Sequence, residues 1–174
     1  PSPRNAYPNI WGSIHIINLL SPAQIMSRLT YIGIDPGVAT GFAVYNSYDK
    51  TFEKIETTDF WGCIGAIKGL FAELGFGMVV VVDNPNLNKA VHWNQIPDVK
   101  KLGINGKCKY AQNVGMNKRE ASLIIQFLKL HNIPHKAIKP TATKKDATYF
   151  KRVTKYKGRT NQHERDAAML VFGL

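Results

Sequence analysis

Tyr31-Ile-Gly-Ile-Asp-Pro-Gly-Val-Ala-Thr-Gly-Phe-Ala-Val-Tyr45 is the stretch of this sequence that decides its fold. The apolar run before Asp35 predicts a buried strand, which Pro36 and Gly37 end directly after the carboxylate. Residues 41–45 predict a second strand that runs back beside the first. A carboxylate that leaves a buried strand at a glycine turn suits a metal or phosphate site, because a backbone without side chains lets a large anionic ligand approach.

A second apolar run supplies another acid. Residues 78–82 read Met-Val-Val-Val-Val, which is typical of a strand buried on both faces of a sheet. The run ends in Asp83, and the Asn-Pro that follows breaks the strand. We therefore expect Asp83 at the carboxyl end of a central strand, as we expect Asp35 at the end of the first.

The C-terminal segment supplies a helix with polar groups on one face. Residues 162–172 predict this helix, and Asn161 is its expected N-cap. His163 and Asp166 are three positions apart and therefore share a face. The two alanines after Asp166 are small enough to let the helix lie close against the sheet.

These segments together resemble the RuvC-type Holliday junction resolvases, within the RNase H-like nucleases. The resemblance covers residues 29–174 and rests on strand-Gly-Ile-Asp-Pro-Gly, a second strand ending in an acid, and a terminal helix with His-x-x-Asp-Ala. It implies an α/β fold with an RNase H-like mixed five-stranded sheet flanked by helices. It also implies a metal-dependent endonuclease for Holliday junctions and related branched DNA. In that family the second strand usually ends in Glu, whereas this chain has Asp83.

The chemistry of phosphodiester hydrolysis predicts what these residues would do. Two hard cations about 4 Å apart can activate a water and stabilise the leaving oxygen, and they need several oxygen ligands. We expect two Mg²⁺ ions per active site, which Mn²⁺ can replace. The predicted metal ligands and catalytic residues are Asp35, Asp83, His163 and Asp166. The resemblance further implies that a lysine near the start of the helix expected from Thr143 to Val153 contacts the scissile phosphate. Lys144 and Lys145 both fit this position.

Each predicted ligand also has a purely structural interpretation. Asp35 can cap its turn, Asp83 can form an Asx-turn before Asn-Pro, and His163 can lie in an exposed first helical turn. Asp166 is harder to explain structurally because it sits among alanines on a buried face. Because this chain has Asp83 where the family usually has Glu, a second function stays open. In it, the same fold binds branched nucleic acid with impaired catalysis. An actin-like or sugar-kinase ATPase would need a second phosphate loop, which this sequence lacks.

Charge independently favours a polyanionic partner. The chain carries a net charge of +11, and its lysines and arginines cluster late in the sequence. A basic run is often only a solvated surface, but this one adjoins the predicted acid cluster, which needs positive flanks to hold a phosphate backbone. The expected DNA-binding residues are Lys144, Lys145, Lys155, Lys157 and Arg159.

Composition also bounds compartment and assembly. Cys63 and Cys108 show no metal-site or disulfide spacing, which favours an intracellular, reducing compartment. No apolar run has the length of a membrane span, so we expect no membrane partner. A four-way junction has two symmetry-related scissile phosphates, which predicts a homodimer. The apolar residues within 124–128 are the candidate interface.

The remaining pattern predicts the elements between the motifs. Further strands are expected over 51–58 and 134–138. Further helices are expected over 64–74, over 118–131 with Asn117 as N-cap and Glu120 completing a capping box, and from Thr143 to Val153. Residues 84–113 are polar and mixed and are assigned to no element. Residues 1–28 form an N-terminal extension of uncertain status.

Overall fold

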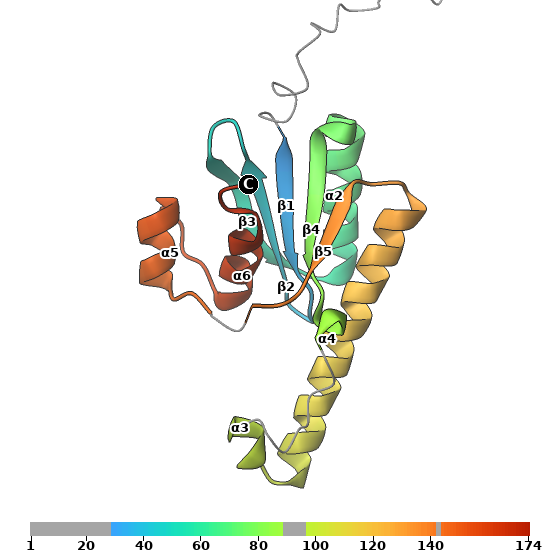
Figure 1. Cartoon of the computed structure of the whole chain (residues 1–174), viewed down its shortest axis with the longest axis vertical. Coiled ribbons are helices and arrows are strands. Elements are labelled where there is room, and N and C mark those ends of the chain that lie inside the picture. The colour runs from blue at the N-terminus through green and yellow to red at the C-terminus, as the bar shows by residue number, and fades with distance from the viewer. Residues whose placement is uncertain (1–28, 89–96, 142–143) are drawn as a thin grey trace, which may run out of the picture.

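One mixed sheet organises the chain. The computed structural model describes residues 29–88, 97–141 and 144–174, so the predicted extension 1–28 lies outside it. Five strands lie in the order β3-β2-β1-β4-β5 (Figure 1). Their bounds are Thr30–Asp35 (β1), Thr40–Asn46 (β2), Thr51–Thr58 (β3), Met78–Asp83 (β4) and His135–Ile138 (β5). β1, β2 and β3 form an antiparallel meander, and β4 and β5 run parallel to β1.

Helices flank the sheet on both faces (Figure 1). Their bounds are Phe60–Leu74 (α2), Pro97–Lys100 (α3), Ile104–Leu130 (α4), Ala147–Thr154 (α5) and Gln162–Val171 (α6), with 3₁₀ turns at Gly75–Gly77 (η1) and Pro85–Leu87 (η2). The main core lies under α2 and the C-terminal half of α4, while α6 covers the other face. The predicted α/β fold class, a mixed five-stranded sheet flanked by helices, is confirmed. No helix within the described ranges has both the length and the hydropathy that crossing a membrane requires.

The alternation of side chains decides which face the strand acids use. Ile34 and Val82 are fully buried in the core under α2 and α4. Successive side chains on a strand point to opposite faces. Asp35 and Asp83, each one residue later, therefore emerge on the face that α6 covers.

The long helix is much longer than the sequence predicts. It begins at Ile104 rather than near Lys118, so Asn117 lies inside it and is not an N-cap. Its buried residues all lie from Ala121 onward. The N-terminal half therefore has no buried apolar stripe. Apolar residues recur at helical spacing only in the half of the helix that packs on the sheet.

The same helix corrects the expected dimer surface. Ile124 and Leu128 are fully buried in the core between α4 and the sheet, and Ile125 packs against that core. The apolar stripe is needed to cover one sheet face, so it offers no surface to a second copy.

Two helix starts also differ from expectation. α2 begins at Phe60, because the Asp59 carboxylate accepts a 2.7 Å hydrogen bond from the Gly62 N–H and caps the first turn. Asp146 caps α5 in the same way, accepting from the Tyr149 N–H at 2.8 Å. The cap predicted for α5, Thr143, lies outside the described residues.

Glycines in β1 and β2 let α6 approach the sheet backbone. A side chain at Gly33 would overlap the carbonyl oxygen of Ala167, and one at Gly41 would overlap that of His163. Glycine inside a strand often marks such a close approach. The predicted close packing of α6 is thus confirmed, and it depends on the strand glycines in addition to the helix alanines.

This packing predicts a large effect of one methyl group. Gly33→Ala should lower the free energy of unfolding by about 3 kcal/mol, because backbone atoms of α6 and β1 would have to separate. Gly69→Ala is the matched control, since nothing lies within 4 Å of the added methyl group on the outside of α2. The control should be neutral or stabilising by up to about 1 kcal/mol. Urea denaturation of both variants tests this, and equal stabilities would contradict the close approach of α6.

Candidate active site

The predicted site residues meet at one edge of the sheet. Asp35 and Asp83 end the parallel strands β1 and β4, and α6 brings His163 and Asp166 over the same edge. His163 Nδ1 lies 2.8 Å from Asp35 Oδ2. Because a carboxylate only accepts, the Nδ1 atom carries the proton of this hydrogen bond. His163 is therefore a partner of Asp35 and not merely an exposed first-turn residue.

Asp166 has two partners of its own. Lys144 Nζ contacts its Oδ2 atom, and Gln162 Nε2 donates to Oδ1 at 2.6 Å. Lys145 instead lies over the ring of Tyr149, 5.0 Å from its centroid. Of the two lysines left open by the sequence, Lys144 faces the carboxylates and Lys145 faces away.

Asp83 is the least compensated carboxylate of the three. Its Oδ1 atom is buried and has no hydrogen-bond partner among the described residues. The pKa of Asp83 is raised from 3.8 to about 6, mainly by burial and also by the charges of Asp35 and Asp166, while Lys144 opposes the rise. Burial also raises the pKa of Asp35, with the hydrogen bond and charge of His163 acting against it. The site therefore concentrates negative charge in a partly dry environment.

The start of α6 is fixed by a capping box. The Asn161 side chain accepts from the Glu164 N–H at 3.0 Å, and the Glu164 carboxylate accepts from the Asn161 N–H at 2.8 Å. Glu164 also accepts a 3.0 Å hydrogen bond from Thr57 at the end of β3. The first turn of α6, which carries His163, is thus tied to the sheet. The Asn-x-x-Glu spacing was visible in the sequence.

Arg165 is a positioning residue that sequence reasoning missed. Its guanidinium donates to the carbonyl oxygens of Lys145 (3.0 Å) and Thr160 (2.6 Å), and to the Gln162 side chain (2.9 Å). These bonds hold the segment before α5 against α6 and so place Lys144 beside Asp166. No local pattern signals such a role, because its partners are backbone atoms brought close only by the fold.

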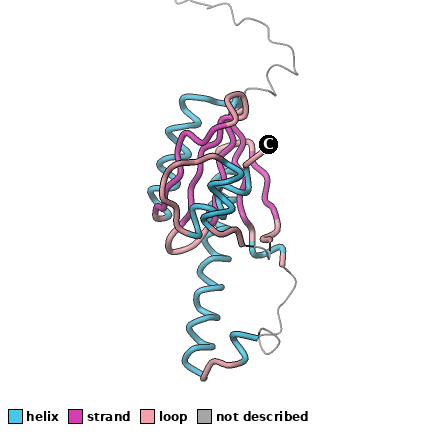
Figure 2. Tube along the Cα trace, turned by 90° about the vertical axis from the view of Figure 1, so that its left-hand side faces the viewer, coloured by secondary structure: helices cyan, strands magenta, loops and turns pink. Residues whose placement is uncertain are grey.

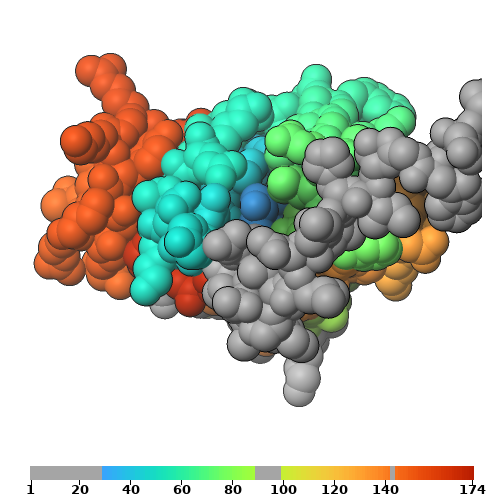
Figure 3. Space-filling view, turned by 90° about the horizontal axis from the view of Figure 1, so that it is seen from above, coloured from blue at the N-terminus to red at the C-terminus, as the bar shows by residue number. Residues whose placement is uncertain are grey.

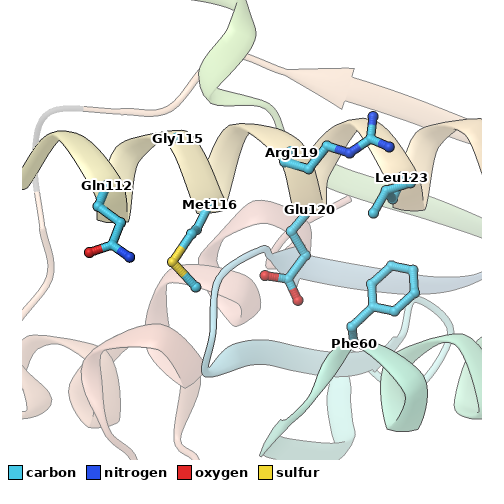
Figure 4. Close-up of a pocket in the computed structure, with 7 residues that line it drawn as sticks. All are labelled: Phe60, Gln112, Gly115, Met116, Arg119, Glu120 and Leu123. Atoms are coloured by element: carbon cyan, nitrogen blue, oxygen red, sulfur yellow. The ribbon is translucent and has the colours of Figure 1, made fainter.

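The turn after β1 is held from the opposite face by α4. Thr40 Oγ1 donates to the Gly37 carbonyl at 2.8 Å and lies 3.2 Å from Glu120 Oε1. The Asn117 side chain lies against Gly37. A shallow groove of about 490 Å³ opens beside Glu120, between Phe60 and the residues of α4 shown in Figure 4. None of the groove's lining residues belongs to the carboxylate cluster.

The side-chain atoms of the site are of the kinds that bind a divalent cation, but most of them are hydrogen-bonded to one another or to neighbouring side chains. Carboxylate oxygens are the preferred ligands of Mg²⁺, and the buried Asp83 oxygen lacks any partner among the described residues. Within the described ranges, however, no three His, Cys, Asp or Glu side chains are placed to hold one ion together. Metal binding would require Asp35 and Asp166 to exchange His163, Lys144 and Gln162 for the ion.

The remaining predicted DNA-binding residues lie beyond α5. Lys155 ends that helix with a positive φ of 59°, and Lys157 and Arg159 follow on the loop to α6. All three side chains are exposed. The α5 region forms one end of the molecule when it is seen from above (Figure 3). This basic loop therefore leads directly into the helix that carries His163 and Asp166.

Comparison with known proteins finds a match to a solved structure at low sequence identity. The structure of T. thermophilus RuvC in complex with Holliday junction substrate matches with a TM-score of 0.49 and 13% sequence identity, over 83% of this chain and 91% of that chain. No family model matches the chain, and a search of curated proteins finds no match. The case for function therefore rests on the residues of this chain.

Proposed function

We propose that this chain is a metal-dependent endonuclease that cleaves Holliday junctions and related branched DNA by phosphodiester hydrolysis. The observation that carries the proposal is the meeting of Asp35, Asp83 and Asp166 at one sheet edge, with a buried Asp83 oxygen that lacks a partner among the described residues. The negative charges of Asp35 and Asp166 raise the pKa of Asp83, and that of Asp166 also raises the pKa of Asp35. A cation bound among them would relieve that repulsion.

Asp35, Asp83, His163 and Asp166 would hold two Mg²⁺ ions, or Mn²⁺ in their place. When bound, such ions lower the pKa of a water nucleophile and stabilise charge on the leaving oxygen. His163 would act as a neutral ligand or orient the attacking water.

Lys144 would contact the substrate in addition to its partner in the free protein. Its ammonium group contacts Asp166, and its side chain as a whole is more than half exposed. If an ion takes its place on Asp166, Lys144 becomes available to the scissile phosphate. The other cations proposed to flank the DNA are Lys145, Lys155, Lys157 and Arg159.

The proposed active form is a homodimer. Symmetric cleavage of a four-way junction needs two active sites related by a twofold axis. The buried residues Ile124 and Leu128 are not its interface. Sedimentation with and without junction DNA would show whether two copies assemble.

One observation favours the alternative of a binding module with impaired catalysis. Lys144 and Gln162 already satisfy Asp166, and no three metal-binding side chains converge within the described residues. Asp83 is also one methylene shorter than the Glu that the family resemblance leads one to expect.

A cleavage assay separates these functions. Labelled four-way junction, linear duplex and RNA–DNA hybrid would each be incubated with Mg²⁺, Mn²⁺ or EDTA. We expect nicking of the junction with either metal, little cleavage of the duplex and none in EDTA. Tight junction binding without cleavage under any condition would support the binding module. Preferential cleavage of the hybrid would contradict the proposed substrate.

A further inference from the structure

A basic arm projects from the sheet edge that carries the carboxylates. We define the arm as residues 97–119, which comprise α3, the short connection after it and the N-terminal half of α4. Both views show this part of α4 extending well beyond the sheet (Figures 1 and 2). β1, β4 and the projecting part of α4 all point toward the same end of the molecule (Figure 1). The arm therefore joins the rest of the domain beside the turn that follows β1.

The arm contributes little to the core of the domain. Every buried residue of α4 lies after the arm, from Ala121 onward. Inside the arm, Val99 is 1% exposed and Leu102 packs against Gly106, so α3 folds back on α4. Two glycines, Gly106 and Gly115, each cost about 1 kcal/mol relative to alanine within a helix. Packing among the described residues does not explain a helix of this composition.

Apart from Asp98 at its start, the charged residues of the arm are all basic. From residue 99 to residue 119 the chain has no Asp or Glu. Its basic residues are Lys100, Lys101, Lys107, Lys109, Lys118 and Arg119. Like charges along one helix repel one another, and a polyanion removes that repulsion while releasing its own counterions. This one-sided charge favours a phosphate backbone over a protein surface as the occupant.

The arm and the basic loop after α5 reach the carboxylates from different sides. The loop with Lys155, Lys157 and Arg159 leads into α6, on the face where Asp35 and Asp83 emerge. The arm joins the body where Asn117 lies against Gly37, on the face covered by α4. A DNA segment held by the loop at the carboxylates would therefore leave the arm free to contact another segment.

We propose that the arm binds the phosphate backbone of a second duplex segment, one that leaves the branch point away from the scissile phosphate. This inference rests on the proposed function and deepens it, because it assigns the preference for branched over linear DNA to a specific surface. A short linear duplex offers one segment and engages the loop alone. Branched DNA offers two and engages loop and arm together.

Paired substitutions test the arm in EDTA, where binding is measured without cleavage. Lys101→Gln/Lys109→Gln removes two exposed charges from the arm, and Lys68→Gln/Lys129→Gln removes two exposed charges elsewhere. The salt dependence of four-way junction affinity should fall by about 1.8 log units per log unit of salt in the arm variant, at about 0.9 per lost contact. Affinity for a short linear duplex should stay unchanged. The control pair should change neither slope. Equal losses on junction and linear duplex would overturn the proposal.

Cys108 gives a direct readout of what the arm contacts. It is exposed on the arm, whereas the only other cysteine, Cys63, is fully buried. Thiol tethers placed along the junction phosphates should cross-link to Cys108 on a duplex segment away from the cleaved phosphate, and a linear duplex should not cross-link. Cross-linking beside the cleaved phosphate, or equally to linear duplex, would overturn the proposal. So would loss of self-association in the arm variant with unchanged DNA affinity, because the arm would then contact a second copy.

The two proposals fail separately. Cross-linking of Cys108 to a second segment by a chain that never cleaves would support the arm and contradict the nuclease. Metal-dependent nicking with no change in junction affinity in the arm variant would support the nuclease and overturn the arm.

Discussion

Asp35→Asn is expected to abolish metal-dependent nicking of a four-way junction while leaving junction binding intact or tighter. Asp35 is engaged by His163 at 2.8 Å, and its charge raises the pKa of Asp83. The substitution removes a proposed metal ligand and one negative charge close to where phosphate would bind. Loss of one member of a catalytic unit typically costs at least about a thousandfold in rate.

Single-turnover cleavage with Mg²⁺ and equilibrium binding in EDTA separate the two effects. Asp49→Asn is the matched control, because Asp49 is exposed in the turn between β2 and β3. The control should cleave as fast as the parent protein. If Asp35→Asn also cleaves at the parent rate, the carboxylate cluster is not the active site.

Asp83→Asn is expected to stabilise the metal-free protein and to abolish its cleavage. The folded-state pKa of Asp83 is raised from 3.8 to about 6, mainly by burial. The folded state therefore binds this proton more tightly than the unfolded state does. The resulting stability is present below pH 3.8 and is lost as the pH rises through about 6. At neutral pH the ionised Asp83 carboxylate lowers the free energy of unfolding, and an uncharged asparagine side chain does not.

The expected gain at pH 7 is about 1–2 kcal/mol, since one pKa unit corresponds to about 1.4 kcal/mol and the side chain is partly exposed to solvent. Below pH 4 the two proteins should have nearly equal stability. Urea denaturation in EDTA at both pH values measures this. A variant less stable than the parent at pH 7 would mean that Asp83 is a favourable turn residue and that its charge is well compensated.

Asp83→Glu distinguishes two cases. In one, Asp83 is a metal ligand whose side chain is too short, and in the other it is not a ligand. A carboxylate one methylene shorter leaves a ligand about 1 Å from its ideal place, an error that can cost on the order of a hundredfold in rate. We expect Asp83→Glu to cleave at least as fast as the parent, most clearly with Mg²⁺, whose octahedral geometry is strict. If only this variant cleaves, the chain as it stands is the binding form. If Asp83→Asn matches an active parent, another acid completes the site.

The sequence alone determined the sheet and the candidate ligands. Apolar runs, proline and glycine breaks, and the spacing of His163 and Asp166 are local signals that tertiary structure seldom overrides. Strand polarity then places Asp35 and Asp83 at one edge, because parallel neighbours end on the same side. The five strands accordingly lie within a residue or so of their predicted bounds.

Only the tertiary structure decided what surrounds those ligands. The choice between Lys144 and Lys145 depends on Arg165, whose partners are distant backbone oxygens. The apolar face around Ile124 proved to be core, because burial depends on which surface a helix meets and not on its own pattern. The helical structure of the arm was not predicted from the sequence, for the opposite reason. The N-terminal half of α4 does not pack on the sheet and so carries no apolar period, which is why residues 84–113 were assigned to no element from the sequence.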